Sequence, residues 1–166
     1  MTVIASYYYN EGQRVKEVAI DERVAFDNSR SGFCWIGLSE PTAGELRSLQ
    51  ENYGLHPLAV DNAMHPQCPP KLEVYNGELY VVANTAELDG DRIRYGKTAI
   101  FTGHNHLITV RHGTPGALGN LREQLEASPA QFGKGVDYVL HAILHRIVDQ
   151  YLPIFEMIED DVLAME

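Results

Sequence analysis

The order of strand-like and helix-like patterns in the sequence predicts an α/β domain that ends in a long helix. Two strand-like segments, 72–75 and 79–88, flank an Asn-Gly dipeptide at 76–77, the strongest short signal for a two-residue β-hairpin. The segment from Ser39 to Gly54 carries helix signals at both of its ends. From Val136 onwards, apolar residues recur every three or four positions, which is typical of a helix with one buried face.

The other predicted elements follow from the same kinds of signal. Further strands are indicated by runs rich in Val, Ile, Tyr and Phe that are bounded by turn residues: Val3–Tyr9 with its hairpin partner Arg14–Ile20, the short buried strand Gly32–Leu38, Ile93–Phe101, and Leu107–Arg111. Two more helices are predicted, at His56–Met64 and Pro115–Ala127. This mixture of strands and helices assigns the chain to the α/β class.

The final helical pattern runs from Val136 to Glu166, which corresponds to about 46 Å at the rise of an α-helix. Pro153 lies inside the pattern and predicts a kink or the start of a new segment. The last turn contains no Gly, Asn, Pro or basic residue, so we expect the helix to continue beyond Glu166. We therefore divide the chain into an α/β part at residues 1–135 and a helical extension at 136–166.

Composition and charge limit the possible functions. Hydrophobic residues make up 45% of the chain, which predicts a folded core. The formal net charge is −10, which argues against nucleic acid or an anionic lipid surface as partner. Cys34 and Cys68 form no Cys-x-x-Cys pair, so free thiols in a reducing compartment are expected. The sequence contains neither a secretory signal nor an apolar run long enough to span a bilayer, which predicts a soluble fragment.

One helical face carries a candidate metal-binding row. His141, His145 and Asp149 are spaced four residues apart in the final pattern, so they project from the same side of the helix. Such a face can offer three ligands to a divalent ion. The same residues also fit an ordinary boundary beside the apolar stripe, and the spacing alone is a weak signal that favours the boundary over a metal site. Asp61, near a predicted helix end, is open in the same way as a ligand, a cap or a surface charge.

Other motifs favour no catalytic chemistry. The segment Gly90–Thr98 resembles a phosphate-binding loop, but it has one residue too many and lies between two predicted strands instead of before a helix. His104, His106 and His112 surround a predicted strand without an evident carboxylate partner, and we expect them to be surface residues. Neither Gly-x-Ser-x-Gly nor His-Glu-x-x-His occurs, so the sequence predicts no enzyme.

Five segments, in order, resemble the cytoplasmic domain of the CorA family of magnesium and cobalt transporters. They are Trp35–Pro41 with Glu45, Leu46 and Leu49; Tyr53–Asn62; Pro70–Tyr75 with Leu79–Val82; His106–Arg111; and Leu144–Pro153. The last segment also matches a family motif that has a proline within the helix. No segment is decisive alone, but five in the right order and spacing are specific.

The resemblance implies an α/β/α sandwich around a mixed β-sheet, followed by long helices that lead to membrane-spanning segments beyond this sequence. It also implies a homopentamer on the cytoplasmic side of the inner (plasma) membrane, with Mg²⁺ bound between neighbouring subunits. In this family, bound cations hold the pore closed, and their loss lets acidic domains repel one another. The acidity of the chain suits that mechanism.

The resemblance points to Asp61, Asn62, His145 and Asp149 as residues near an intersubunit metal ion. Two of them depart from the family pattern, because Asn62 and His145 stand where the family has Asp. Amide oxygen still suits Mg²⁺, whereas imidazole favours Zn²⁺, Co²⁺ or Ni²⁺. The sensed ion is therefore expected to be Mg²⁺, with Co²⁺ or Zn²⁺ as alternatives.

Three functional hypotheses remain open at this point. The first is a regulatory, cation-sensing domain of a divalent-ion transporter. The second is a free-standing cytosolic binding or scaffold protein of the same fold, which a stop codon after Glu166 would favour. The third is a nucleotide-dependent enzyme built on Gly90–Thr98, which would require a strand, a loop and a helix there.

Overall fold

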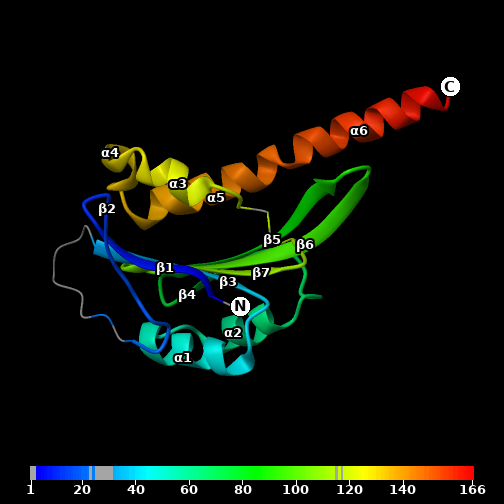
Figure 1. Ribbon diagram of the computed structural model, residues 1–166. Coiled ribbons are helices and arrows are strands. Elements are labelled where there is room, and N and C mark those ends of the chain that lie inside the picture. Colours follow the sequence, from blue (N-terminus) through cyan, green and yellow to red (C-terminus); the bar gives the residue numbers. More distant parts are fainter. Residues whose placement is uncertain (1–2, 23, 25–31, 115, 117) are drawn as a thin grey trace.

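Seven strands form a single mixed sheet in the part of the chain that the structure describes (Figure 1). The structure is a computed structural model and describes residues 3–22, 24, 32–114, 116 and 118–166. The strands are β1 (Val3–Asn10), β2 (Gln13–Glu17), β3 (Gly32–Ser39), β4 (Lys71–Tyr75), β5 (Glu78–Asp89), β6 (Arg92–Thr102) and β7 (His106–His112). Their order is β2-β1-β3-β7-β6-β5-β4, and β3 pairs with β7 in parallel while the other neighbouring pairs are antiparallel.

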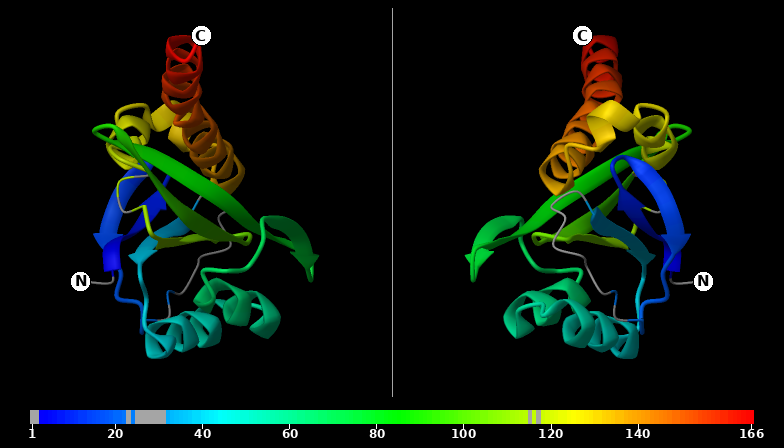
Figure 2. Two further views of the ribbon diagram at one scale, coloured as in Figure 1. Left: turned by 90° about the vertical axis from the view of Figure 1, so that its right-hand side faces the viewer. Right: turned by 90° about the vertical axis from the view of Figure 1, so that its left-hand side faces the viewer.

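Helices cover both faces of this sheet (Figures 1 and 2). They are α1 (Ala43–Tyr53), α2 (Pro57–Met64), α3 (Leu121–Glu126), α4 (Pro129–Phe132), α5 (Val136–Asp149) and α6 (Tyr151–Ala164). The pair α1 and α2 packs on one face, and the helices α3 to α5 pack on the other. The predicted α/β/α sandwich around a mixed sheet is therefore confirmed.

Each face of the sheet has its own hydrophobic core. Ile36, Ile108 and Val110 point toward α1 and α2, and they pack with Leu46 and Leu49. The alternate residues of the same strands point the other way and pack with the helices α3 to α5; this second core includes Trp35, Leu107, Phe132, Val139 and Ile143. Because side chains alternate along a strand, the apolar runs of β3 and β7 supply both cores.

Local signals explain the limits of α1 and α2. Thr42 and Glu45 form a capping box, in which the Thr42 hydroxyl accepts from the Glu45 amide and the Glu45 carboxylate accepts from the Thr42 amide. Gly54 ends α1 in the left-handed conformation, as predicted. His56 caps α2 by accepting a hydrogen bond from the amide of Leu58.

Two predicted elements differ from the structure. β2 ends at Glu17, so it is shorter than the predicted strand Arg14–Ile20. The predicted helix Pro115–Ala127 was wrong over its first part, because residues 118–120 form a turn in which Gly119 has a positive φ of 48°. The helix α3 begins only at Leu121, and Pro115 itself lies outside the described residues.

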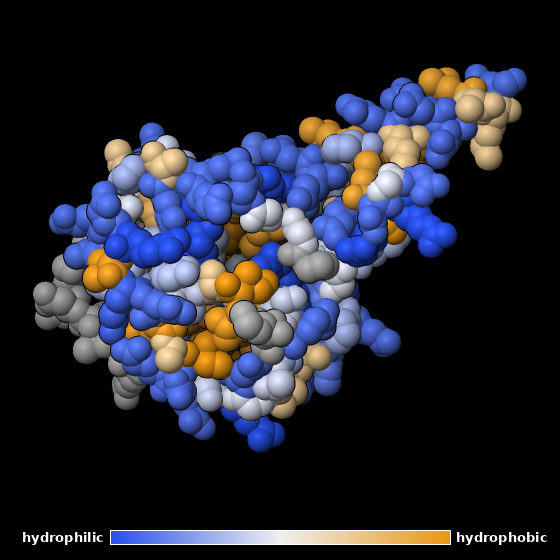
Figure 3. All heavy atoms as spheres, viewed as in Figure 1, coloured by the Kyte–Doolittle hydropathy of each residue, from blue (hydrophilic) through white to orange (hydrophobic). Residues whose placement is uncertain are grey.

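The helical pattern after Val136 forms two nearly continuous helices, with Gln150 in helical conformation between α5 and α6. Pro153 lies in the first turn of α6, where its missing amide hydrogen costs no hydrogen bond. α6 projects beyond the sheet (Figure 1) and carries apolar side chains on its surface (Figure 3). Within the described residues, no helix has the length and apolar character needed to cross a membrane.

Candidate functional site

Asp61 and Asn62 lie in the second half of α2, facing away from the core. Asp61 is exposed, and its Oδ1 lies 3.9 Å from Nε2 of His65, one helical turn later. Asn62 is partly buried, and its backbone carbonyl accepts the amide hydrogen of His65. The two side chains are therefore available to an ion that approaches α2 from outside.

The predicted row on α5 is present and faces solvent. His145 Nε2 lies 3.2 Å from Asp149 Oδ2, and both side chains are more than half exposed. The rings of His141 and His145 are nearly parallel, with centroids 6.1 Å apart. These contacts place one carboxylate and two imidazoles on one helix face. The opposite face is buried against the sheet and carries Val139, Ile143 and Ile147. A divalent ion could find two adjacent donors here.

The two halves of the predicted metal site lie far apart within one chain. α2 covers one face of the sheet and α5 covers the other, so the sheet separates Asp61 and Asn62 from His145 and Asp149 (Figures 1 and 2). Among the described residues, no group of three or more His, Cys, Asp or Glu side chains is arranged to hold a metal ion. An ion that contacts both pairs at once therefore needs two copies of the chain.

The acidic residues near the end of the chain lie on the projecting α6 and just after it. Each of them is exposed: Glu156, Glu159, Asp160, Asp161 and Glu166. Salt-bridge partners for them are absent from the described residues. The projecting helix is therefore a strongly negative surface, which attracts cations and repels a second surface of the same kind.

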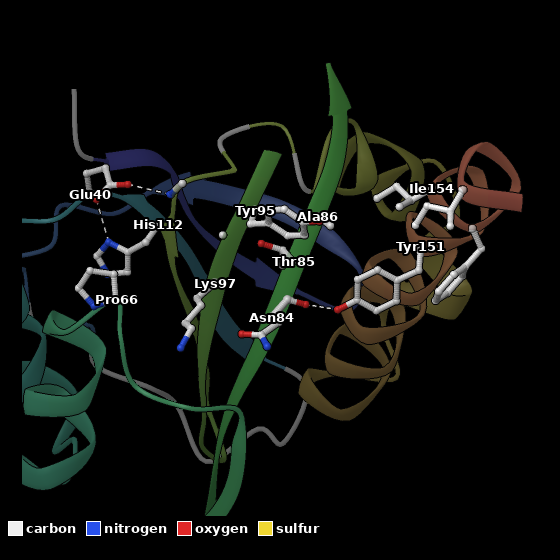
Figure 4. A pocket seen from close by; sticks show the side chains of 14 residues that line it. Glu40, Pro66, Asn84, Thr85, Ala86, Tyr95, Lys97, His112, Tyr151 and Ile154 are labelled. Atoms are coloured by element: carbon white, nitrogen blue, oxygen red, sulfur yellow. Dashed lines mark hydrogen bonds and ion pairs between the residues drawn. The ribbon is translucent and has the colours of Figure 1, made fainter. Parts of the chain in front are cut away.

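A cleft of about 760 Å³ lies between the β5–β6 hairpin and α6 (Figure 4). Its α6 side is apolar, with Ile154, Phe155 and Ile158, and the Tyr151 hydroxyl anchors it by donating to the backbone carbonyl of Asn84. The cleft's opposite end reaches His112. Its polar groups are spread along the walls and form no nucleophile–base pair.

At that end of the cleft, His112 on β7 contacts the residue that follows β3 and the second half of α2. Its Nδ1 lies 2.8 Å from Glu40 Oε2, and its Nε2 lies 2.8 Å from the backbone carbonyl oxygen of Ala63 (Figure 4). The His112 hydrogen bond, helped by one from the amide of Gly113, lowers the pKa of Glu40 below its usual range. The prediction that His112 is a surface residue without a carboxylate partner was therefore wrong: its side chain is only 12% exposed, and Glu40, which is distant in sequence, reaches it in the fold.

The prediction was also wrong for His106, which is only 5% exposed. Its ring lies 5.3 Å from that of Tyr53, and Gly103 makes room for it, because a Cβ there would lie 2.2 Å from the imidazole. Burial lowers the pKa of His106 to about 4. Of the three histidines, only His104 is exposed as expected.

The structure removes the phosphate-loop interpretation of Gly90–Thr98. Gly90 forms the tight turn between β5 and β6 with a positive φ of 67°. β6 then runs from Arg92 through Lys97 to Thr102, so no helix N-terminus points its amides at this loop. The nucleotide-dependent enzyme hypothesis, which required such a helix, therefore fails.

The fold is that of a known class of domain. Over 99% of its length, the chain superposes with a TM-score of 0.74 and 22% sequence identity on the soluble domain of CorA from Methanocaldococcus jannaschii, of which it covers 64%. At this identity the likeness establishes the fold alone.

The sequence establishes the family. Residues 30–166 match the CorA-like Mg²⁺ transporter protein family, and the chain belongs to that family. It is 30% identical over 157 residues to the protein YfjQ of Bacillus subtilis, covering 94% of this chain and 47% of that protein. It is 24% identical over 154 residues to the cobalt/magnesium transport protein CorA of M. jannaschii, covering 92% and 47%. The chain thus spans about half the length of these relatives.

Proposed function

We propose that this chain is the cytoplasmic, cation-sensing part of a divalent metal ion transporter. The observation that carries the proposal is the family match over residues 30–166, which covers most of the sheet and all the helices. The proposed location is the cytoplasmic side of the inner membrane, with the membrane-spanning segments outside this sequence. Residues 1–135 would then form the sensing domain, and residues 136–166 the helical connection toward the membrane.

The proposed sensing site lies between neighbouring subunits of a homo-oligomer, a pentamer by likeness to the family. Asp61 and Asn62 of one subunit would meet His145 and Asp149 of the next. Two features support this pairing: both sets are at least partly exposed, and they lie on opposite faces of the same domain. A face-to-back contact of this kind repeats around a closed ring, because each subunit offers one face and receives the other.

Charge provides the proposed coupling between ion binding and the pore. A net charge of −10 per chain, with an acidic α6, makes neighbouring subunits repel one another. Bound cations would lower that repulsion and hold the subunits together, and loss of the cations would let them separate. The pore would therefore be closed when the site is occupied and open when it is empty.

The donor set gives a proposed order of affinity among ions. Asp61, Asp149 and the Asn62 amide are oxygen donors, which suit Mg²⁺. The imidazole of His145 is a borderline nitrogen donor, which binds Co²⁺ and Zn²⁺ more strongly. We therefore expect Co²⁺ and Zn²⁺ to bind more tightly than Mg²⁺, although Mg²⁺ is the more abundant ion in cells.

Isothermal titration of the oligomeric protein with Mg²⁺, Co²⁺ and Zn²⁺ tests the proposal. The Asp61→Ala and His145→Ala variants should each weaken binding by at least about tenfold, since each removes a direct ligand. Glu51→Ala, which removes an exposed acid on α1, is the matched control and should bind like the wild type. Absence of binding by the oligomer, or an equal effect of all three variants, would contradict the proposal.

A mixing experiment tests whether the site is shared between subunits. The two variants Asp61→Ala and His145→Ala are each defective in every site. In a mixed ring, about a quarter of the interfaces would combine an intact α2 with an intact α5, so partial binding should return. If both pairs instead acted within one subunit, mixing would restore nothing, and the intersubunit site would be refuted.

A further inference from the structure

A second pocket, of about 360 Å³, lies on the α3 side of the sheet and is lined by three arginines. They come from distant parts of the sequence: Arg14 from β2, Arg111 from β7 and Arg122 from α3. Glu123 is the only acidic side chain among the lining residues. This concentration of positive charge is unusual in a chain with 23 acidic and 13 basic residues.

Arg122 is fixed in place by aromatic and backbone groups. Its guanidinium carbon lies 4.0 Å from the centre of the Trp35 ring, and Nη2 donates to the Trp35 carbonyl oxygen at 3.2 Å. Its Nη1 donates to the hydroxyl of Tyr9 at 2.8 Å. Both of these partners are uncharged. A partly buried guanidinium held by neutral groups retains its attraction for an anion.

Arg14 is held by an aromatic ring and a carboxylate. Its guanidinium carbon lies 3.8 Å from the centre of the Tyr7 ring. Glu126 accepts hydrogen bonds from Arg14 and, at 2.7 Å, from the Tyr9 hydroxyl. The Glu126 carboxylate therefore bonds Arg14 directly and contacts Arg122 only through the Tyr9 hydroxyl. One negative charge cannot fully balance the two positive charges of Arg14 and Arg122.

Arg111 and Thr109 form the floor of the pocket. Burial and then the charge of Arg122 lower the pKa of Arg111, while the carboxylate of Glu87 acts in the opposite direction. Thr109 is fully buried, lines the pocket, and its Oγ1 has no hydrogen-bond partner among the described residues. Gly37 lies beside it without a side chain, and a Cβ there would be 3.5 Å from Oγ1. A buried hydroxyl without a hydrogen-bond partner lowers the stability of the fold, and a ligand that accepts its hydrogen bond removes this penalty.

We propose that this pocket binds a phosphate group, either inorganic phosphate or the terminal phosphate of a nucleotide. Arg14, Arg111 and Arg122 would surround the oxyanion, and the Thr109 hydroxyl would donate a further hydrogen bond. Three guanidiniums match a doubly charged tetrahedral oxyanion better than a single carboxylate, because a carboxylate offers only two oxygens and one charge. This binding is independent of the proposed cation site, which lies on α2 and on the outer face of α5.

Titration with inorganic phosphate, at constant ionic strength and without divalent metal, tests the proposal. The wild-type chain should show saturable binding by calorimetry and ³¹P NMR. Arg14→Gln should weaken it by about tenfold, because a charge-assisted hydrogen bond is lost from a side chain that is 42% exposed and tolerates replacement. Thr109→Val preserves the shape of the floor and should weaken binding by about fivefold.

Controls separate the pocket from general attraction to positive charge. Arg47→Gln removes an exposed charge from α1, on the opposite face of the sheet, and should leave binding unchanged. ATP in competition with phosphate, with adenosine as the uncharged comparison, identifies the source. Displacement of phosphate by ATP but not by adenosine supports recognition of the phosphate group. If ATP binds and inorganic phosphate does not, and Arg14→Gln weakens the binding of ATP, the site is assigned to a nucleotide.

Two results would overturn the proposal. One is the absence of saturable binding of phosphate and of ATP at millimolar concentrations. The other is an equal loss of binding in Arg14→Gln and Arg47→Gln, which would mean that net charge alone attracts the anion. Urea unfolding of each variant must show a cooperative transition, so that weakened binding reports the pocket and not a lost fold.

Discussion

Replacing the buried His106 should remove a specific part of the pH dependence of folding. Burial lowers the pKa of His106 to about 4, against a usual value near 6.5. As the pH falls below about 6.5, the unfolded chain takes up a proton at this residue and the folded chain does not, so stability is lost until the pH reaches about 4. At about pH 5.5 the protonated imidazole outnumbers the neutral form about tenfold in the unfolded chain. This protonation lowers the free energy of unfolding by about 1.4 kcal/mol relative to about pH 8.

The groups that face His106 limit the useful pH range. Glu78 Oε2 lies 3.9 Å from His106 Nε2, and burial raises the pKa of Glu78. A raised carboxyl pKa acts in the opposite direction, because the folded chain then takes up a proton at a higher pH than the unfolded chain does. Stability is therefore gained as the pH falls toward the pKa of an ordinary Glu. The phenol of Tyr53, whose pKa burial raises, stays neutral throughout. Glu78 is present in the wild type and in both variants, so the effect of His106 is taken from the difference between the proteins and not from the acid-induced loss in one of them.

Urea unfolding of the wild type, His106→Asn and His104→Asn at about pH 8 and about pH 5.5 gives the comparison. The loss of stability on acidification should be about 1.4 kcal/mol smaller in His106→Asn than in the wild type. The exposed His104 is the control, and its variant should keep the wild-type loss. An identical pH dependence in all three proteins, or an NMR titration of His106 with an ordinary imidazole pKa, would refute the reasoning.

Two further predictions concern packing and thiol chemistry. Ile143 is fully buried in the core under α5, so Ile143→Ala should lower the free energy of unfolding by about 3 kcal/mol. Val148→Ala, at a 56% exposed position of the same helix, should change it by less than about 0.5 kcal/mol. Urea unfolding measures both variants, and equal effects would contradict the packing of α5 on the sheet. Burial raises the pKa of the Cys34 thiol to about 11, so the native chain should react quickly with a thiol reagent only at the partly exposed Cys68. In urea both cysteines should react. Rapid reaction of Cys34 in the native chain would contradict its burial.

Most of the sheet could be predicted from the sequence because its strands are bounded by local signals. The Asn76-Gly77 turn, the alternating patterns around it and the buried segment at 32–39 each define an element without reference to the rest of the chain. The same is true of α1, where the capping box at Thr42 and the left-handed Gly54 set both ends. The helical spacing after Val136 correctly indicated α5 and α6, and Pro153 correctly indicated a new segment.

The failures occurred where a residue's environment depends on distant contacts. The segment before α3 was predicted as helix because its composition permits one, but Gly119 adopts a left-handed conformation that ends any helix there. His106 and His112 looked like surface residues because the partners that bury or bond them, Tyr53 and Glu40, lie more than fifty residues away. The cation-binding roles of Asp61 and His145 stay a prediction, since they depend on a second subunit.

The arginine pocket shows the same dependence on topology in its strongest form. Arg14 and Arg122 are separated by more than a hundred residues, and no local motif links either of them to Arg111. Arg14 lies on β2 and Arg111 on β7, with β1 and β3 between these strands, and Arg122 lies on α3; the fold brings all three to the lining of one pocket. Repulsion of Arg122 by Arg14 and by Arg111 raises the free energy of the empty fold, and a bound oxyanion would lower it. Phosphate should therefore raise the free energy of unfolding of the wild type more than that of Arg14→Gln, which links the pocket's charge to stability as well as to binding.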